Sequence, residues 1–161
     1  MIKYNELKEV RYFGSLTFLA EDLKLEVGDN KKYLVCVTER FTGVTWAELT
    51  DNIIEFSYIP ALKVCLYCLR DYYNIEFKEL CTDNNVDFRD KYSSYELDEM
   101  MLKLNIAHSY ENKHNSKVNN CELFCYAFRS YMLNKKIESL EDFKEKLKNY
   151  LLYYNKKKIA E

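Results

Sequence analysis

Asp83 is the residue whose place in the sequence most favours chemistry. It follows a stretch with strand character, residues 75–81 (IEFKELC), and stands near the start of a polar loop from Thr82 to Phe88. In open α/β sheets, functional sites form at the carboxyl ends of strands. A carboxylate at that place is the hard oxygen ligand that magnesium and manganese prefer. The alternative is a structural role, because Asp-Asn-Asn at positions 83–85 is ordinary turn sequence.

The cysteines are a second group that could do chemistry. Cys65 and Cys68 form a C-x-x-C pair, and Cys121 and Cys125 are four residues apart. Zinc sites combine such pairs with a second pair of ligands, usually on turns. Here both pairs lie in apolar helical patterns, and the two histidines lie in another region. We therefore expect buried structural thiols in a reducing compartment.

Length and composition favour one domain with one core. The chain has 161 residues, a net charge of −2, one Pro and three Gly, so it offers no flexible linker. We expect a single domain over 1–161, with a lead-in at 1–14, a frayed basic tail at 155–161 and no separate DNA-binding domain. The start is mixed and charged, unlike a signal peptide, and no apolar run reaches the roughly 18 residues of a membrane span. These features predict an intracellular protein with no membrane partner.

Lysines gather near the end of a chain that is otherwise slightly acidic. This run is either a solvated helix face or a DNA contact, and the acidic balance favours the first interpretation. Its members are Lys135, Lys136, Lys144, Lys146, Lys148, Lys156, Lys157 and Lys158.

The hydrophobic pattern predicts three strands followed by helices that alternate with strands. Strands are expected at 15–25, 32–40, 44–49, 75–81 and 105–109. Helices are expected at 59–73, 92–104 and 118–134, and a last helix follows a capping box at Ser139–Asp142. A strand, a helix and a strand in succession imply parallel pairing, whereas the first three strands form an antiparallel meander.

Five segments carry a family resemblance, and they occur in the family's order. They are 33–48 (YLVCVTERFTGVTWAE), 81–88 (CTDNNVDF), 104–110 (LNIAHSY), 114–119 (HNSKVN) and 139–157 (SLEDFKEKLKNYLLYYNKK). Together they resemble the catalytic core of retroviral-type integrases and of the transposases of insertion sequences, which are mobile elements. The resemblance spans about residues 15–158. It implies an RNase-H-like α/β fold with a five-stranded mixed sheet flanked by helices.

The resemblance also implies a metal site of three carboxylates, two Asp and one Glu. Such a site holds two magnesium or manganese ions for in-line displacement at phosphorus. Asp83 occupies the second position. In these integrases 35 residues separate the second and third positions, and 35 residues separate Asp83 from Asn119, which therefore stands where Glu is expected. Glu122, about one helical turn further on, is a possible substitute.

The first position of the triad is ambiguous. Counting back from Tyr33 places Ala20 there, and an alternative register places Glu21 there. Strand alternation puts Ala20 and Asp22 on one face and Glu21 on the other, so a slip of one residue changes the answer. We favour Ala20, with Glu21 and Asp22 as exposed charges or as displaced metal ligands.

Departures from the family's pattern weaken the expectation of contacts with DNA phosphates. The basic residues that normally follow the catalytic Glu are missing, and Glu39 stands where the family has Asp in the second strand. Lys113, His114, Lys117 and Arg129 are either phosphate contacts or ordinary surface residues.

Three functions follow from these observations. The favoured one is a degenerate, catalytically inactive core, without a cofactor, that binds DNA weakly or binds protein, including a second copy in a homodimer. The second is an active metal-dependent nuclease or polynucleotidyl transferase of DNA integration, which would use magnesium or manganese with displaced carboxylates. The third is a regulator or inhibitor built on an RNase-H-like scaffold.

Overall fold

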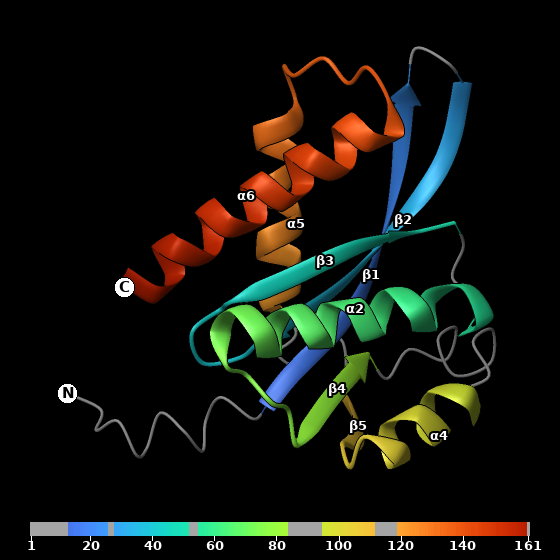
Figure 1. Ribbon diagram of the computed structural model, residues 1–161, viewed down its shortest axis with the longest axis vertical. Helices are drawn as coiled ribbons and strands as arrows, with labels where there is room; N and C mark the ends of the chain where they lie inside the picture. The colour runs from blue at the N-terminus through green and yellow to red at the C-terminus, as the bar shows by residue number, and fades with distance from the viewer. Residues whose placement is uncertain (1–12, 26–27, 52–54, 84–94, 112–118, 161) are drawn as a thin grey trace.

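The computed structural model of the protein describes residues 13–25, 28–51, 55–83, 95–111 and 119–160 (Figure 1). Within these residues the elements follow the predicted order, β-β-β-α-β-α-β-α-α. The strands are β1 (Phe13–Leu25), β2 (Gly28–Glu39), β3 (Thr45–Thr50), β4 (Glu79–Asp83) and β5 (Ala107–Glu111). The helices are α2 (Glu55–Tyr73), α4 (Tyr95–Lys103), α5 (Asn119–Met132) and α6 (Leu140–Ala160).

The described strands form one mixed sheet in the order β3-β2-β1-β4-β5. β1, β2 and β3 are antiparallel neighbours, as expected for strands joined by short turns. β4 pairs parallel with β1 and with β5 because helices connect these strands. The predicted mixed α/β class is confirmed.

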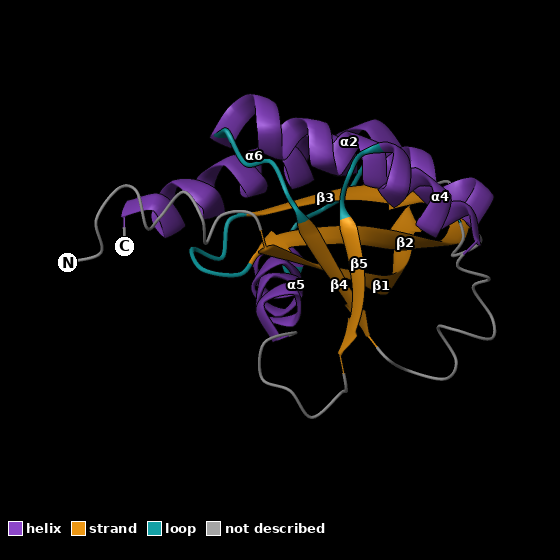
Figure 2. Ribbon diagram, turned by 90° about the horizontal axis from the view of Figure 1, so that it is seen from below, coloured by secondary structure: helices purple, strands orange, loops and turns teal. Residues whose placement is uncertain are grey.

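Helices cover both faces of the sheet. Figure 2 shows α2 and α4 on one face and α5 on the opposite face. β2 lies between these layers, and its residues Leu34, Val35, Cys36 and Val37 are all 0% exposed. A strand covered on both faces reads as a continuous apolar run, which explains the LVCV sequence. None of the described helices combines the length and apolar character needed to cross a bilayer.

α2 is longer than predicted. It begins at Glu55 rather than Ile59, so Pro60 lies in the second turn and not the first. Pro60, which is exposed, has no N–H to donate to the carbonyl four residues earlier, that of Phe56. The sequence rule that places proline in a first turn therefore gave a start that was four residues late.

Two helix ends with a left-handed Asn lead into the parallel strands. After α2, Asn74 has a φ of 55°, and the Ile75 N–H donates to the Leu69 carbonyl at 3.1 Å. After α4, Asn105 has a φ of 57°, and the Ile106 N–H donates to the Met101 carbonyl at 2.8 Å. The α4 end is a Schellman motif, whereas the α2 end has the αL-type bond from the Asn74 N–H to the Arg70 carbonyl at 2.9 Å. In both, a left-handed Asn takes the place that Gly usually occupies.

These helix ends correct two predicted strands. Residues 75–81 and 105–109 were expected as strands, but β4 and β5 begin at Glu79 and Ala107. Ile75 and Phe77 are buried, which gave them strand character in the sequence. Both residues lie in the connection between the end of α2 and the start of β4, so they are buried without belonging to the strand.

α6 protects the edge of the sheet at β3. Asn155 is fully buried, and its amide pairs with one residue of the edge strand. The Thr45 N–H donates to Asn155 Oδ1 at 2.8 Å, and Asn155 Nδ2 donates to the Thr45 carbonyl at 2.7 Å. The expectation of a frayed tail at 155–161 is wrong for residues 155–160, which are helical, because this contact holds the end of α6 in place.

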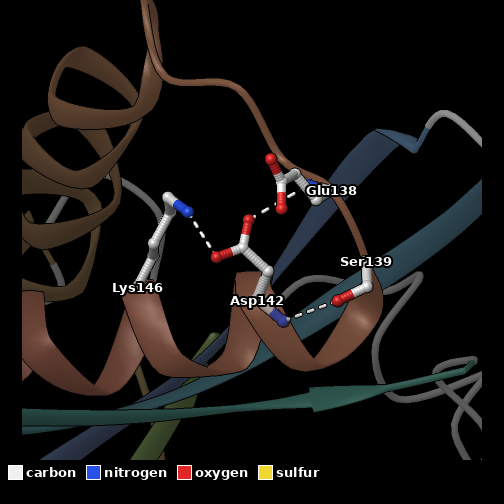
Figure 3. A network of polar contacts seen from close by, with 4 residues as sticks. All are labelled: Glu138, Ser139, Asp142 and Lys146. Atoms are coloured by element: carbon white, nitrogen blue, oxygen red, sulfur yellow. Dashed lines mark hydrogen bonds and ion pairs between the residues drawn. The ribbon is translucent and has the colours of Figure 1, made fainter.

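The predicted cap at Ser139 forms the start of α6. The Asp142 N–H donates to Ser139 Oγ at 3.0 Å, and Asp142 Oδ2 accepts the Glu138 N–H at 3.0 Å (Figure 3). In a capping box, the Asp142 side chain would accept the N–H of the cap residue, Ser139. Here it accepts the N–H of Glu138, one residue earlier. Asp142 also forms an ion pair with Lys146. The Lys146 ammonium, followed by the Glu138 N–H, lowers the pKa of the Asp142 carboxyl.

Candidate functional site

Asp83 lies at the carboxyl end of the parallel part of the sheet. It is the last residue of β4, and its Cα partner in β5 is Glu111, the last residue of that strand. Two acidic residues therefore end adjacent parallel strands, at the sheet edge where functional sites form in α/β folds. Glu111 was not considered in the sequence, because the predicted β5 ended two residues before it.

Asn119 is the first residue of α5, the helix that covers the sheet face opposite α2. Glu122 follows within the same first turn. The backbone thus has the element that the third position requires, a helix after the last strand. The residue at its start is a neutral amide.

The strand register brings Thr17 into the candidate site. The ladder between β1 and β4 ends at Ser15 and Cys81. Continued by two residues, the same register puts Thr17 level with Asp83. Ala20, Glu21 and Asp22 lie three to five residues further along β1, about 10–17 Å at roughly 3.3 Å per residue.

The length of the first hairpin explains why Thr17 was missed. Counting back from Tyr33 assumed the family's usual hairpin, whereas here β1 and β2 pair from Gly14–Glu39 as far as Leu25–Gly28. Tyr33 therefore pairs with Ala20, well toward the hairpin turn. Gly28 beside Asp29, a turn-forming dipeptide, was the available signal for this length.

Of the four candidate phosphate contacts, the structure describes only Arg129. Lys113, His114 and Lys117 lie outside the described residues. Arg129 is exposed in the last turn of α5, ten residues beyond Asn119 and about 15 Å along the helix axis.

Glu39 has a structural role in this fold. Its side chain is 0% exposed, and its carboxylate accepts the N–H of Phe41 at 2.8 Å and the N–H of Thr42 at 2.9 Å. The Thr42 hydroxyl donates to the same carboxylate. These bonds close the turn between β2 and β3 around Gly43, whose φ is 78°. A buried carboxylate satisfied by backbone donors is stable without a metal.

The cysteine pairs lie on opposite faces of the sheet. Cys65 of α2 lies 3.5 Å from the Val35 carbonyl, whereas Cys125 of α5 lies 3.7 Å from Cys36, sulfur to sulfur. Burial raises the pKa of the Cys121 thiol to about 12. Among the described residues, no three His, Cys, Asp or Glu side chains are grouped to bind a metal.

Comparison with known proteins gives the fold a name. No protein-family model and no curated sequence matches the chain. The magnesium-bound catalytic core domain of HTLV-2 integrase is similar, with a TM-score of 0.61 and 16% identity over 85% of this chain and 82% of that one. The fold is that of a retroviral integrase catalytic core.

Two further structures agree with this integrase-like fold. A chain of the simian T-cell lymphotropic virus intasome in complex with PP2A regulatory subunit B56 gamma has a TM-score of 0.61 and 15% identity, over 88% of this chain and 47% of that one. The BIV integrase core has a TM-score of 0.50 and 13% identity, over 89% and 99%. Identities this low establish the fold alone.

Proposed function

We propose that this integrase-like core has lost the complete metal site and acts as a binding or assembly module. The observation that carries the proposal is Asn119, which begins α5. The 35-residue spacing from Asp83 assigns it to the position of the third carboxylate. The HTLV-2 core, which has the same fold, was described with magnesium. A role related to integration but without strand transfer is consistent with Asn119 at the start of α5 and with the fold shared with the HTLV-2 core.

Charge is the physical reason for the expected inactivity. Two divalent ions about 3.5–4 Å apart repel each other, and bridging carboxylates must offset that repulsion. Asn119 is neutral, and so are Thr17 and Ala20, two of the candidates for the first position. Glu21, the third candidate, is charged but lies four residues beyond Thr17 along β1, about 13 Å at roughly 3.3 Å per residue. Asp83 would then be the one triad carboxylate that remains, which is too little charge for a two-metal site.

The partner that we propose is DNA, bound weakly, or protein, including a second copy of this chain. The dimeric form of the HTLV-2 core and the protein-bound simian intasome support such a role, because each presents this fold in an assembly. Such a module would use the binding surfaces of the integrase fold and would not need metal-dependent catalysis.

Titration calorimetry with magnesium and with manganese tests the proposal, together with an assay of DNA-end cleavage. We expect neither saturable metal binding nor cleavage in the wild type. Asp83→Asn is the matched control, since it removes one charge with little change in shape. Metal binding that disappears in Asp83→Asn, accompanied by cleavage, would overturn the proposal.

Restoring the lost carboxylates tests the register as well. We expect Thr17→Asp combined with Asn119→Glu to gain metal binding, because both positions belong to the same end of the sheet as Asp83. Ala20→Asp combined with Asn119→Glu is the control, which we expect to gain none. A gain in the Ala20 variant alone would instead favour the register read from the sequence.

A second candidate function is an active enzyme with displaced carboxylates, and the pairing of Glu111 with Asp83 favours it. Glu122 would then supply the charge that Asn119 lacks. Glu111→Gln and Glu122→Gln test this candidate, since each would abolish any cleavage that the wild type shows.

A further inference from the structure

Tyrosine rings form a continuous row across α5 and α6. The ring centroids of Tyr131 and Tyr150 are 4.6 Å apart, and those of Tyr150 and Tyr153 are 6.1 Å apart. A lysine lies over each outer ring. Lys135 Nζ is 4.3 Å from the Tyr131 centroid, and Lys157 Nζ is 4.6 Å from the Tyr153 centroid. We call these five residues the tyrosine–lysine surface.

The α6 part of this surface carries charge of one sign. From Lys146 to Ala160 the chain contains five lysines and no acidic residue, although the whole protein carries a charge of −2. Tyr153 is 53% exposed, and Lys156 and Lys157 are exposed beside it. Tyr150, the middle ring, is 7% exposed and belongs to the core, so the row meets solvent at its two ends, at Tyr153 with Lys157 and at half-buried Tyr131 with exposed Lys135. An ordinary solvated helix face does not require this pairing of ring and cation.

The surface lies away from the candidate metal site. Figure 1 shows α6 crossing α5. Its C-terminal half lies at the β3 edge of the sheet, where Asn155 bonds Thr45, whereas Asp83 ends β4 on the other side of β1. Tyr131 is twelve residues beyond Asn119 on α5, about 18 Å along the helix axis. A ligand here would not need Asp83 or a metal.

We propose that the tyrosine–lysine surface binds single-stranded nucleic acid. The inference rests on the proposed function and deepens it, since it assigns the binding module a partner class and a place. A base stacked on Tyr153 would take the position that the Lys157 ammonium now holds, and the ammonium would move to a neighbouring phosphate. Tyr131 and Lys135 repeat this arrangement at the other end of the row.

Single strands fit this surface better than a duplex or an acidic protein. Stacking on tyrosine needs a free base face, which a duplex keeps inside its stack. An acidic peptide would pair with the lysines but would gain nothing from the rings. The tyrosines therefore distinguish the proposal from simple attraction between opposite charges.

Fluorescence anisotropy with a labelled 20-nucleotide oligothymidylate tests the proposal. It is run on the full chain in EDTA, at low and at moderate salt. We expect Tyr153→Leu to weaken binding by about tenfold, in line with the loss of one stacked base. Lys157→Gln should weaken it mainly at low salt and reduce the slope of log affinity against log salt by about 0.7.

Matched controls come from exposed positions on α5 and α4, away from this surface. Tyr126→Leu removes an exposed tyrosine that is five residues, or about 140°, from Tyr131 around α5. Lys103→Gln removes an exposed lysine of α4. We expect wild-type binding from both variants, and circular dichroism should show that Tyr153→Leu remains folded.

Several outcomes would overturn the proposal. They are no binding at low salt, equal binding of an abasic oligonucleotide, preference for a duplex, or wild-type affinity in Tyr153→Leu. The Asp83→Asn variant separates the two proposals, because it should bind the oligonucleotide normally whatever its metal titration shows. A chain that binds metal and also the oligonucleotide would refute the proposed inactivity and leave this inference standing.

Discussion

Two regions of this sheet differ in the contacts that hold them and in the role that we propose for them. At the edge beside β3, the Asn155 amide meets the Thr45 backbone at 2.8 and 2.7 Å, and Phe124 packs fully buried between α5 and α6. At the carboxyl ends of β4 and β5 stand Asp83 and Glu111, and under the proposed function Asn119, which begins α5, replaces a carboxylate. Folding needs the first region and catalysis needs the second. A chain can therefore keep the architecture while its chemistry changes.

Phe124→Ala gives the largest expected effect on this comparison. Phe124 is 0% exposed and contacts the rings of Phe128, Tyr150 and Tyr154. Its loss leaves a cavity between two helices, so we expect the free energy of unfolding to fall by about 3–5 kcal/mol. Urea denaturation measures the change. Tyr126→Ala, at a position 74% exposed on the same helix, should change stability by no more than about 0.5 kcal/mol.

Asn155→Ala should have the second largest effect. It leaves the buried N–H and carbonyl of Thr45 without partners, which should cost about 2–4 kcal/mol. Asn149→Ala, on the exposed side of the same helix, serves as the control in thermal unfolding. If both variants unfold at the same temperature as the wild type, the contact between Asn155 and Thr45 does not stabilise the fold. The β3 edge would then not differ from the region of Asp83 in its contribution to stability.

Asp83→Asn should leave stability almost unchanged. Asp83 and Glu111 are paired positions on neighbouring strands, and like charges at such positions repel. Removing one of them should therefore be neutral or stabilising by roughly 0.5 kcal/mol. Chemical denaturation at neutral pH measures this. A large loss of stability would mean that Asp83 serves the fold, and the two regions would no longer differ as described.

Asp142 should give the smallest effect, visible as a dependence on pH. Its folded pKa is lowered by Lys146 and by the Glu138 N–H. The stability that it contributes is therefore present above its unfolded pKa, near 3.9, and is lost as the pH falls through the lower folded pKa. Asp142→Asn should differ from the wild type in denaturation at pH 7 and approach it in strong acid. A difference that stays constant with pH would exclude this ion pair as the cause.

The sequence predicted the elements better than their ends. Residues 34–37 form an apolar run, so β2 could be recognised locally, and the Ser139 cap could be read from four residues. The start of β4 could not, because buried Ile75 and Phe77 precede the strand and carry the same signal as strand residues. A local hydrophobic pattern indicates that a residue is buried. Whether that residue also pairs within a strand depends on the path of the chain in three dimensions.

The candidate site shows the same limit over longer distances. Asp83 was placed at a strand end from sequence alone, and the structure agrees. Thr17 was missed because its place depends on hairpin length and on a partner strand more than sixty residues away. Asn155 was read as part of a frayed tail because its partner, Thr45, is 110 residues distant. Contacts of this kind leave no periodic trace in a sequence.

The amide of Asn155 has a consequence for solubility. Outer strands are templates on which other chains can add strands, and proteins avoid this by covering or charging their edges. By occupying the outward-facing N–H and carbonyl of Thr45, Asn155 removes one such docking point, and the lysine-rich helix around it keeps like molecules apart. A chain shortened before residue 155 would expose β3 and should aggregate through it, even if the rest of the sheet still formed.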